Sequence, residues 1–411
     1  MSNHGHLWLP FTQMAAFSFE ERTFVRGEGC ELIDARGRRL FDAISSVWTT
    51  IHGHGHPHIV EAIARQAAKL DHATALGAAN PPAVALAERL GALTGLECAF
   101  FSGDGASAVE AALKIALQYW RNVGQPARTR FAHLTHAYHG DTAAAMSVSD
   151  IALFKERFAP LLFETLPYEA LPETLERHDL AAVIVEPRVQ AAAGMLIVPE
   201  DAYAPLRVAR NRPLVIVDEI ATGFGRTGPM FAFTALGLEP DLVCLGKGIT
   251  GGTLALSATL AREYIYAAFL GEHREGRHLF HGHSYAANPI ACAGALASLE
   301  VFDREHTLAH VAELDLALQP LMERVREHAL VREVRRIGLM CAIELRAQEI
   351  DAGAAVSPAW RIADELYRRG QFTRPLGDAI QLVPPPAAAR TELESFTYAL
   401  LDALDAVLGS A

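Results

Sequence analysis

Hydrophobic positions along the chain follow two different spacings. In residues 57–70, and again in residues 107–120, apolar side chains recur every three or four positions, which predicts two amphipathic helices. Residues 181–185, 214–217 and 242–245 are instead short and almost continuously apolar. Such runs are typical of parallel strands that helices cover on both faces, so the pattern predicts an α/β protein.

The pattern changes after about Asn288. Helix-rich sequence is followed by two predicted strands, in residues 338–345 and 379–383, and by a final helix from about Arg390. With 411 residues the chain is too long for one small core. We expect a large domain over residues 51–290 with a mostly parallel, seven-stranded type of sheet. A smaller α+β domain would cover residues 291–411, with residues 1–50 packed beside it.

Composition narrows the class of protein. A net charge of −12 argues against a nucleic-acid partner, which needs a basic face. The chain shows neither a run of about 18 apolar residues nor the basic-then-apolar start of a signal peptide, so we expect no membrane span and a cytoplasmic enzyme. Five scattered cysteines without Cys-x-x-Cys pairs indicate reduced thiols rather than a disulfide framework or a zinc site.

Candidate chemistry gathers where predicted strands end and helices begin. The sequence Ser102-Gly-Asp-Gly-Ala-Ser107 is a glycine-rich turn directly before a helix. Free backbone N–H groups and the positive end of the helix dipole make such a turn a phosphate cradle. An ordinary helix cap, made by Asp104 or Ser107, is the simpler alternative.

Two further residues complete a possible cofactor site. Asp218 closes an apolar strand, where a buried carboxylate needs a cationic partner such as a protonated pyridine nitrogen. Lys247 lies between two glycines after the next strand, where a lysine with a lowered pKa can form a Schiff base. A phosphate anchor, a pyridinium partner and an imine-forming amine are together what pyridoxal 5'-phosphate requires.

Long motifs around these residues resemble a known family. Asp218-Glu-Ile-Ala-Thr-Gly-Phe-Gly-Arg-Thr-Gly228, followed by Pro240-Asp-Leu-Val-Cys-Leu-Gly-Lys-Gly-Ile-Thr-Gly-Gly252, resembles the class III aminotransferases of fold type I. Leu7-Trp-Leu-Pro-Phe-Thr-Gln-Met14 and Ala137-Tyr-His-Gly-Asp-Thr142 are similar to the branch that serves biotin biosynthesis. The resemblance implies amino transfer from S-adenosylmethionine to 8-amino-7-oxononanoate, giving 7,8-diaminononanoate.

The resemblance also implies roles for individual residues. Lys247, Asp218 and Tyr138 would be catalytic, with Lys247 as the Schiff-base lysine and proton carrier. Cofactor contacts would come from these three residues and from Gly105, Ala106, Glu186, His283 and Ser284. Substrate contacts would come from Phe11, Val47, Trp48, Tyr138, Gly282 and Arg374, with Arg374 pairing with a carboxylate. The loop 282–284 would reach the neighbouring subunit's site, so a homodimer is expected.

Three departures from the biotin-branch pattern fall where substrates are expected. Val47 stands where that branch has a tryptophan, Phe11 where it often has a tyrosine, and His283 where a proline is more usual. Pocket shape decides which amine or ketone is accepted. A second interpretation therefore remains, an ω-aminotransferase that acts on another amine and another keto acid or ketone. The segment Val189-Gln-Ala-Ala-Ala-Gly194 argues for the biotin branch, because it lacks the extra glutamate of many class III enzymes.

Other interpretations explain less of the sequence. Gly223-Phe-Gly-Arg-Thr-Gly228 fits the pattern of dinucleotide-binding folds, but a nicotinamide-dependent dehydrogenase leaves Lys247 unexplained. The alternating histidines 52, 54, 56 and 58 would suggest a metal site, but their glycine- and proline-rich setting favours a loop, and we expect no metal. A non-catalytic binding protein of the same fold would have no use for a Schiff-base lysine.

Overall fold

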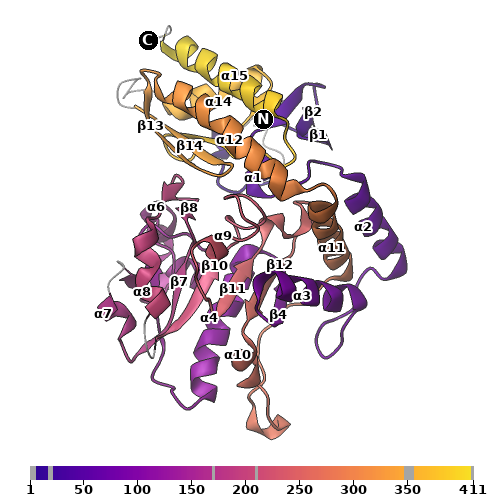
Figure 1. The fold of residues 1–411 in the computed structure, drawn as a ribbon, viewed down its shortest axis with the longest axis vertical. Helices are drawn as coiled ribbons and strands as arrows, with labels where there is room; N and C mark the ends of the chain where they lie inside the picture. Colours follow the sequence, from indigo (N-terminus) through magenta and orange to yellow (C-terminus); the bar gives the residue numbers. More distant parts are fainter. Residues whose placement is uncertain (1–5, 17–21, 169–171, 209–211, 347–355, 409–411) are drawn as a thin grey trace.

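A seven-stranded sheet forms the centre of the protein in the computed structural model, which describes residues 6–16, 22–168, 172–208, 212–346 and 356–408 (Figure 1). Its strands, in spatial order, are β4 (Cys98–Ser102), β12 (Ser257–Ala261), β11 (Leu242–Leu245), β10 (Leu214–Asp218), β7 (Leu180–Val185), β5 (Arg130–Leu134) and β6 (Leu166–Tyr168). Strand β12 is antiparallel to both of its neighbours, and the other pairs in the sheet are parallel. The predicted mostly parallel α/β sheet is therefore confirmed.

Helices cover both faces of this sheet, as continuous apolar strands require. On one face, Ala182, Ile184 and Ile216 pack in a core with the buried side of α4 (Gly105–Asn122). On the other face, Val183, Val215 and Val217 join a core that also contains residues of α3 (Pro81–Thr94) and α11 (Pro289–Arg304). Alternate residues of each strand thus serve opposite layers.

Shorter elements connect the strands and helices of this part. They are α2 (Pro57–Lys69), α5 (Ala143–Ser147), α6 (Ala152–Lys155), η2 (Glu156–Leu161), α7 (Pro172–Leu175), β8 (Val189–Gln190), β9 (Leu196–Ile197), η3 (Glu200–Tyr203), α8 (Ala204–Val208), α9 (Ala232–Ala235), η4 (Lys247–Thr250), α10 (Glu263–Ala267) and η5 (His273–Glu275). Helix α4 begins at Gly105, two residues before the predicted helix. The glycine-rich segment therefore supplies the first turn of the helix itself.

A second core lies beyond α11. It contains a three-stranded antiparallel sheet, in the order β13 (Val331–Ile337), β14 (Met340–Leu345) and β16 (Ala379–Leu382), packed with α12 (Thr307–Arg326), α14 (Pro358–Arg368) and α15 (Arg390–Leu408). The predicted strand over 338–345 is thus the second arm of a hairpin, because Gly338 has a φ of +55° and allows a tight turn after β13.

The beginning of the described chain lies beside its end. After η1 (Met14–Ala16), strands β1 (Phe24–Glu28), β2 (Glu31–Asp34) and β3 (Arg39–Asp42) form an antiparallel sheet, and β15 (Gln371–Phe372) adds to β3 in parallel. Figure 1 shows this indigo segment next to the yellow and orange elements of the second core. A short element, α1 (Ser45–Trp48), leads from β3 toward the large sheet.

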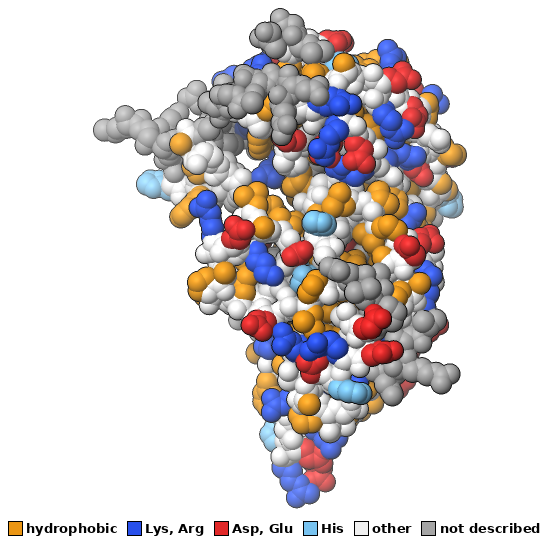
Figure 2. All heavy atoms as spheres, turned by 90° about the vertical axis from the view of Figure 1, so that its left-hand side faces the viewer, with side chains coloured by type: hydrophobic (Ala, Val, Ile, Leu, Met, Phe, Trp, Pro, Cys, Tyr) orange, Lys and Arg blue, Asp and Glu red, His pale blue; other side chains and the backbone are white. Residues whose placement is uncertain are grey.

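Charges of both signs are interspersed on the face that Figure 2 shows, with apolar side chains between them. Leu153 and Leu161, near α6, are among the exposed apolar residues, at 78% and 70% exposure. Among the described helices, none combines the length and the apolar character that crossing a membrane demands.

Candidate active site

A cavity of about 450 Å³ opens where the parallel strands of the large sheet end. Because β7, β10 and β11 are adjacent and parallel, the residues at their carboxyl ends meet at one edge of the sheet. Glu186, Asp218 and Lys247 follow or end these strands, and all three line the cavity. The predicted catalytic lysine and aspartate are thus brought together with the start of α4.

Lys247 is held in an unusual backbone conformation. It follows Gly246 at the end of β11, begins η4, and has a φ of +41°, in the left-handed region that a side chain rarely adopts. Its Nζ lies 5.1 Å from the centre of the Trp48 ring. Burial lowers the pKa of the Lys247 amine, against the opposing effect of Asp218 and Glu186. A lowered pKa gives a larger fraction of the neutral, nucleophilic amine.

Asp218 has a partner that the sequence did not indicate. Its Oδ2 lies 2.7 Å from Nδ1 of His139, and its Oδ1 accepts a hydrogen bond of 3.0 Å from the N–H of Ile220. Both Asp218 and His139 are buried, and Nε2 of His139 meets no polar partner among the described residues. His139 stands within the Ala137–Thr142 motif, but its spacing of 79 residues from Asp218 gave no local signal of the contact.

Glu186 is a buried acid at the cavity wall. It accepts hydrogen bonds from the N–H groups of Tyr138, at 3.0 Å, and Ala191, at 3.2 Å. Burial raises the pKa of Glu186 to about 7. Glu186 therefore fixes the backbone of Tyr138, and the cofactor contact expected for it stays a prediction.

The first turn of α4 presents backbone donors to the cavity. Asp104 caps the helix, because its Oδ1 accepts the N–H of Ser107 at 2.9 Å. The N–H groups of Gly105 and Ala106 stay without an acceptor among the described residues, and both residues line the cavity. The cap and the phosphate cradle are therefore compatible, since they use different N–H groups.

Close packing around the first turn of α4 leaves no room for larger side chains. A Cβ at Gly105 would lie 2.9 Å from Cγ2 of Ile220, and one at Gly140 would lie 2.5 Å from Cβ of Ala106. Two polar side-chain atoms nearby, Ser102 Oγ and His283 Nε2, are buried without hydrogen-bond partners in the described part of the chain. His283 lies beside Gly103. Neither Ser102 nor His283 lines the cavity within this chain, although both lie next to the turn that precedes α4.

A row of aromatic rings leads from the cavity toward the N-terminal segment. Tyr138 lines the cavity and donates its hydroxyl hydrogen to Oδ2 of Asp141 at 2.8 Å. Its ring contacts Phe154, with ring centres 5.9 Å apart, and Phe154 contacts Phe11 at 5.3 Å. Phe11 is more than half exposed, so the row ends at the surface.

A second path runs from Lys247 to Arg374. Trp48 donates its indole N–H to Oε1 of Gln381 at 3.0 Å, and Nε2 of Gln381 donates to the carbonyl of Arg374 at 2.7 Å. Arg374 in turn donates to the carbonyl of Phe11 at 3.0 Å, and burial lowers its pKa. Arg374 and Phe11 do not line the cavity themselves. They lie at the end of the series of hydrogen bonds that begins at Trp48 and passes through Gln381.

The remaining predicted residues lie outside the cavity wall. Val47 is half exposed, and Gly282, His283 and Ser284 belong to a loop whose side chains do not line the cavity within this chain. Gly282 lies near Leu76, since a Cβ there would be 3.4 Å from Cδ2 of that leucine. Their expected contribution to a neighbouring subunit stays a prediction.

Arg226 is a buried charged residue that the sequence did not single out. It lies within Gly223–Gly228, is 1% exposed, and donates to Ser45 Oγ at 2.9 Å, the Pro384 carbonyl at 2.8 Å and the Thr50 carbonyl at 2.6 Å. Burial lowers the pKa of Arg226 to about 9. The glycine pattern around it leads to the four-residue helix α9 rather than to a long nucleotide-binding helix.

The alternating histidines face different partners. His52 contacts Ser298, His54 contacts Asp42, His56 contacts Glu305 and His58 contacts Glu300. Burial lowers the pKa of His52 to about 3. These rings therefore join the 52–58 segment to α11 and to the end of β3.

The groups around the cavity fit pyridoxal phosphate. The free N–H groups of α4 suit a phosphate, the Asp218 carboxylate suits a protonated ring nitrogen, and the Lys247 amine suits an aldehyde. Ile220 and Ala221 give the same cavity an apolar wall. This arrangement is suited to reactions of amines.

Comparisons with known proteins agree with this geometry. The profile of aminotransferase class III matches residues 16–404. The adenosylmethionine-8-amino-7-oxononanoate aminotransferase of Nitratidesulfovibrio vulgaris is 42% identical, covering 98% of this chain and 81% of that protein. The protein of the same name from Aquifex aeolicus is 41% identical, covering 94% of this chain and 93% of its own.

Solved structures give the same family. The adenosylmethionine-8-amino-7-oxononanoate aminotransferase of Methanocaldococcus jannaschii aligns with a TM-score of 0.91 and 37% identity over 98% of this chain and 97% of that one. An amine transaminase from an uncultivated Pseudomonas species, solved in its PLP-bound form, aligns with a TM-score of 0.88 and 34% identity over 98% of both chains. The chain therefore belongs to the class III aminotransferases, as its motifs predicted.

Proposed function

We propose that this chain is a pyridoxal-phosphate-dependent enzyme that transfers the amino group of S-adenosylmethionine to 8-amino-7-oxononanoate, giving 7,8-diaminononanoate for biotin biosynthesis. The observation that carries this proposal is the convergence of Lys247, Asp218 and the first turn of α4 on one cavity. The names of the relatives with about 40% identity support the choice of substrates.

The residues of the chain would divide the work of holding the cofactor. Gly105 and Ala106 would donate their N–H groups to the phosphate, and Asp218, kept in place by His139, would pair with the ring nitrogen. Bound pyridoxal phosphate supplies an electron sink for the bond that breaks at the amine carbon. Lys247 would hold the aldehyde covalently, and its Nζ would then carry the proton that moves during transfer.

Other residues would orient the substrates. Tyr138, with its hydroxyl fixed on Asp141, would form one wall of the cavity, and Trp48 would form the wall above Lys247. Arg374 would bind a substrate carboxylate through two parallel hydrogen bonds. Its guanidinium is already tied on one side to the Phe11 carbonyl, which limits its freedom.

The assembly and location follow the same proposal. Loop 282–284 would complete the site of a second subunit in a homodimer, with Ser284 contacting the phosphate there. The chain would divide at about residues 50 and 290 into an N-terminal segment, a large cofactor-binding domain and a small domain. We place the enzyme in the cytoplasm, because the five described cysteines are free thiols.

A second candidate function is amino transfer from another amine, as in ω-aminotransferases. Val47 favours it, because this half-exposed residue is much smaller than the tryptophan that the biotin branch has at this position. The structural similarity to the Pseudomonas amine transaminase supports the same alternative.

One experiment tests both candidates. The protein is loaded with pyridoxal phosphate, and the loss of the visible absorbance of the lysine-bound cofactor is followed after addition of S-adenosylmethionine, lysine, diamines or ω-amino acids. We expect the fastest loss with S-adenosylmethionine, followed by recovery on addition of 8-amino-7-oxononanoate. A fast response to another amine, with none to S-adenosylmethionine, would replace the first candidate by the second.

A further inference from the structure

The segment Ser45–Trp48 is a turn of left-handed helix built from residues other than glycine. Ser45, Ser46, Val47 and Trp48 have φ angles of 50°, 48°, 64° and 67°. The N–H of Trp48 donates to the carbonyl of Ile44 at 2.7 Å, so the turn closes as a helical turn does. L-residues adopt this conformation singly rather than in succession, because Cβ crowds the next carbonyl oxygen. Surrounding contacts must therefore hold the segment in place.

Asp42, at the end of β3, supplies contacts that act on the turn directly. Its Oδ1 accepts the N–H of Ser46 at 3.0 Å, and its Oδ2 accepts the Ser46 hydroxyl at 2.8 Å. The Asp42 side chain is fully buried. A carboxylate that grips both the backbone and the side chain of one residue fixes the conformation of that residue.

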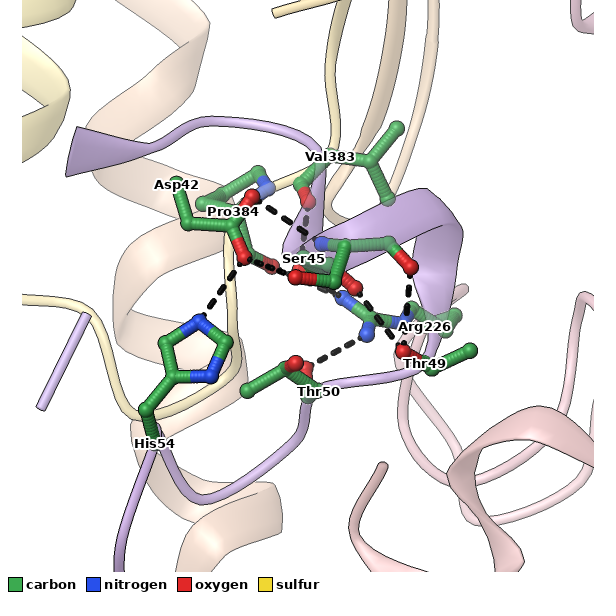
Figure 3. Close-up of polar contacts among 9 residues, drawn as sticks. Asp42, Ser45, Thr49, Thr50, His54, Arg226, Val383 and Pro384 are labelled. Carbon is green, nitrogen blue, oxygen red and sulfur yellow. Dashed lines mark hydrogen bonds and ion pairs between the residues drawn. The ribbon is translucent and has the colours of Figure 1, made fainter. Parts of the chain in front are cut away.

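His54 links the Asp42 side chain, at the end of β3, to strand β1 of the same sheet. Its Nε2 lies 2.9 Å from Oδ2 of Asp42 (Figure 3). The same oxygen also accepts the Ser46 hydroxyl. The backbone of His54 is paired with Gly29 in both directions, at 3.1 and 2.6 Å. A Cβ at Gly27 would lie 2.6 Å from Cβ of His54, so the ring packs directly on β1. The position of Asp42 is thereby tied to the sheet.

The turn delivers one side chain to the reacting centre. Trp48, at its end, is buried, lines the cavity and lies 5.1 Å from Nζ of Lys247. The hydrogen bond from the indole N–H to Gln381 fixes the orientation of the ring, and the left-handed backbone fixes the direction of the Trp48 Cα–Cβ bond. If the turn relaxed to right-handed angles, the Cα–Cβ bond of Trp48 would change direction and the ring would leave Lys247.

We propose that Asp42, supported by His54, is a positioning residue that holds the left-handed turn Ser45–Trp48 and thereby sets the Trp48 ring against Lys247. The inference rests on the proposed function, because it assigns the turn a purpose in amine transfer. Asp42 acts through Ser46 and does not itself reach the cavity.

The test uses the full chain loaded with pyridoxal phosphate and compares two double variants. Asp42→Ala/Ser46→Ala removes the two contacts between Asp42 and Ser46 and leaves a Cβ at position 46, where the left-handed angles are unfavourable. Asp42→Ala/Ser46→Gly removes the side-chain contacts of Asp42 as well, but glycine adopts the left-handed angles without a Cβ clash. We expect the rate of the first half-reaction with the preferred amine to fall about tenfold or more in the alanine pair, and to recover to within about threefold in the glycine pair.

A spectroscopic measurement separates positioning from loss of fold. The pH at which the visible band of the lysine-bound cofactor titrates should shift in the alanine pair and return in the glycine pair, because the Trp48 ring contacts the lysine. Asp34→Ala is the matched control: Asp34 is also buried and accepts N–H groups of Arg36 and Arg38, at 2.9 Å each, in the same sheet. It should leave both measurements unchanged.

Two results would overturn the inference while leaving the proposed function intact. One is a half-reaction rate within about twofold of wild type in a folded Asp42→Ala variant, and the other is identical behaviour of the glycine and alanine pairs. If the Asp42 variants do not fold, Ser46→Ala and Ser46→Gly in the wild-type background remove the hydroxyl contact alone and keep the N–H contact with Asp42. The half-reaction should then be slower in the alanine variant than in the glycine variant, and equal rates would overturn the inference. A wild-type chain that binds no pyridoxal phosphate would overturn the proposed function and this inference together.

Discussion

Glu219 offers a quantitative test of the electrostatics beside Asp218, the aspartate that we propose pairs with the cofactor. It follows Asp218 directly, is fully buried, and accepts hydrogen bonds from the Thr222 hydroxyl and the Phe233 N–H, at 2.7 Å each. Burial, with a further contribution from Asp218, raises the pKa of Glu219 from 4.5 to about 7. We therefore choose the substitution Glu219→Gln, which mimics the protonated acid.

The raised pKa fixes the sign of the pH dependence. Because the folded pKa lies above the unfolded one, the folded state keeps a proton that the unfolded state has released, so this group's contribution to stability falls as the pH rises from about 4.5 to about 7. At about 1.4 kcal/mol per pKa unit, the loss between about pH 5 and about pH 8 is about 2.5 kcal/mol. Glutamine has no proton to lose. The variant should gain this amount relative to wild type over the same interval.

The assay is urea unfolding of the cofactor-free protein, followed by tryptophan fluorescence near both pH values. The quantity compared is the change in the free energy of unfolding between the two pH values, in the variant minus that in wild type, so that the contributions of other titrating groups cancel. Glu164→Gln, at a side chain that is 89% exposed, is the control and should show about no change. If Glu219→Gln gains less than about 0.5 kcal/mol between the two pH values, Glu219 is ionised in the folded protein and the reasoning fails.

Three further predictions concern the site itself. Lys247→Ala should abolish the visible absorbance of the lysine-bound cofactor and reduce amino transfer by about a thousandfold or more, as single-turnover kinetics can measure; undiminished transfer would contradict the role of Lys247. Asp218→Asn should reduce turnover by about a hundredfold or more without reducing the free energy of unfolding, because it removes a buried charge. A fall in the free energy of unfolding together with the loss of turnover would point to a structural role. Arg374→Lys should raise the KM of a carboxylate-bearing acceptor about tenfold, because an ammonium cannot form two parallel hydrogen bonds, and should leave an uncharged acceptor unaffected.

The local parts of the fold could be predicted from the sequence. Apolar runs before Glu186 and Asp218 predicted buried parallel strands, because such strands lack the polar alternation of an exposed face. The ends of those strands indicated where ligand chemistry would gather, and Lys247, Asp218, Gly105 and Ala106 do line one cavity. Their roles toward the cofactor stay predictions.

The contacts that could not be predicted are non-local or depend on unusual backbone angles. His139 and Asp218 are 79 residues apart in the chain, and Arg226 meets Ser45 across 181 residues. The left-handed turn at Ser45–Trp48 contains no glycine, so no residue type marked its positive φ angles. Strands in residues 24–42 were also not predicted, because short strands with alternating burial give a weak signal.

The pairing of β3 with β15 has a consequence for how the protein is made. Residues 371 and 372 complete a sheet that begins at Phe24. On the ribosome, the first strands must therefore wait until nine-tenths of the polypeptide has been synthesised before their last partner emerges. Throughout that interval the edge of β3 is open to other chains. The yield of folded protein during synthesis should accordingly be limited by capture of this edge, and a chaperone that shields nascent amino termini should raise that yield.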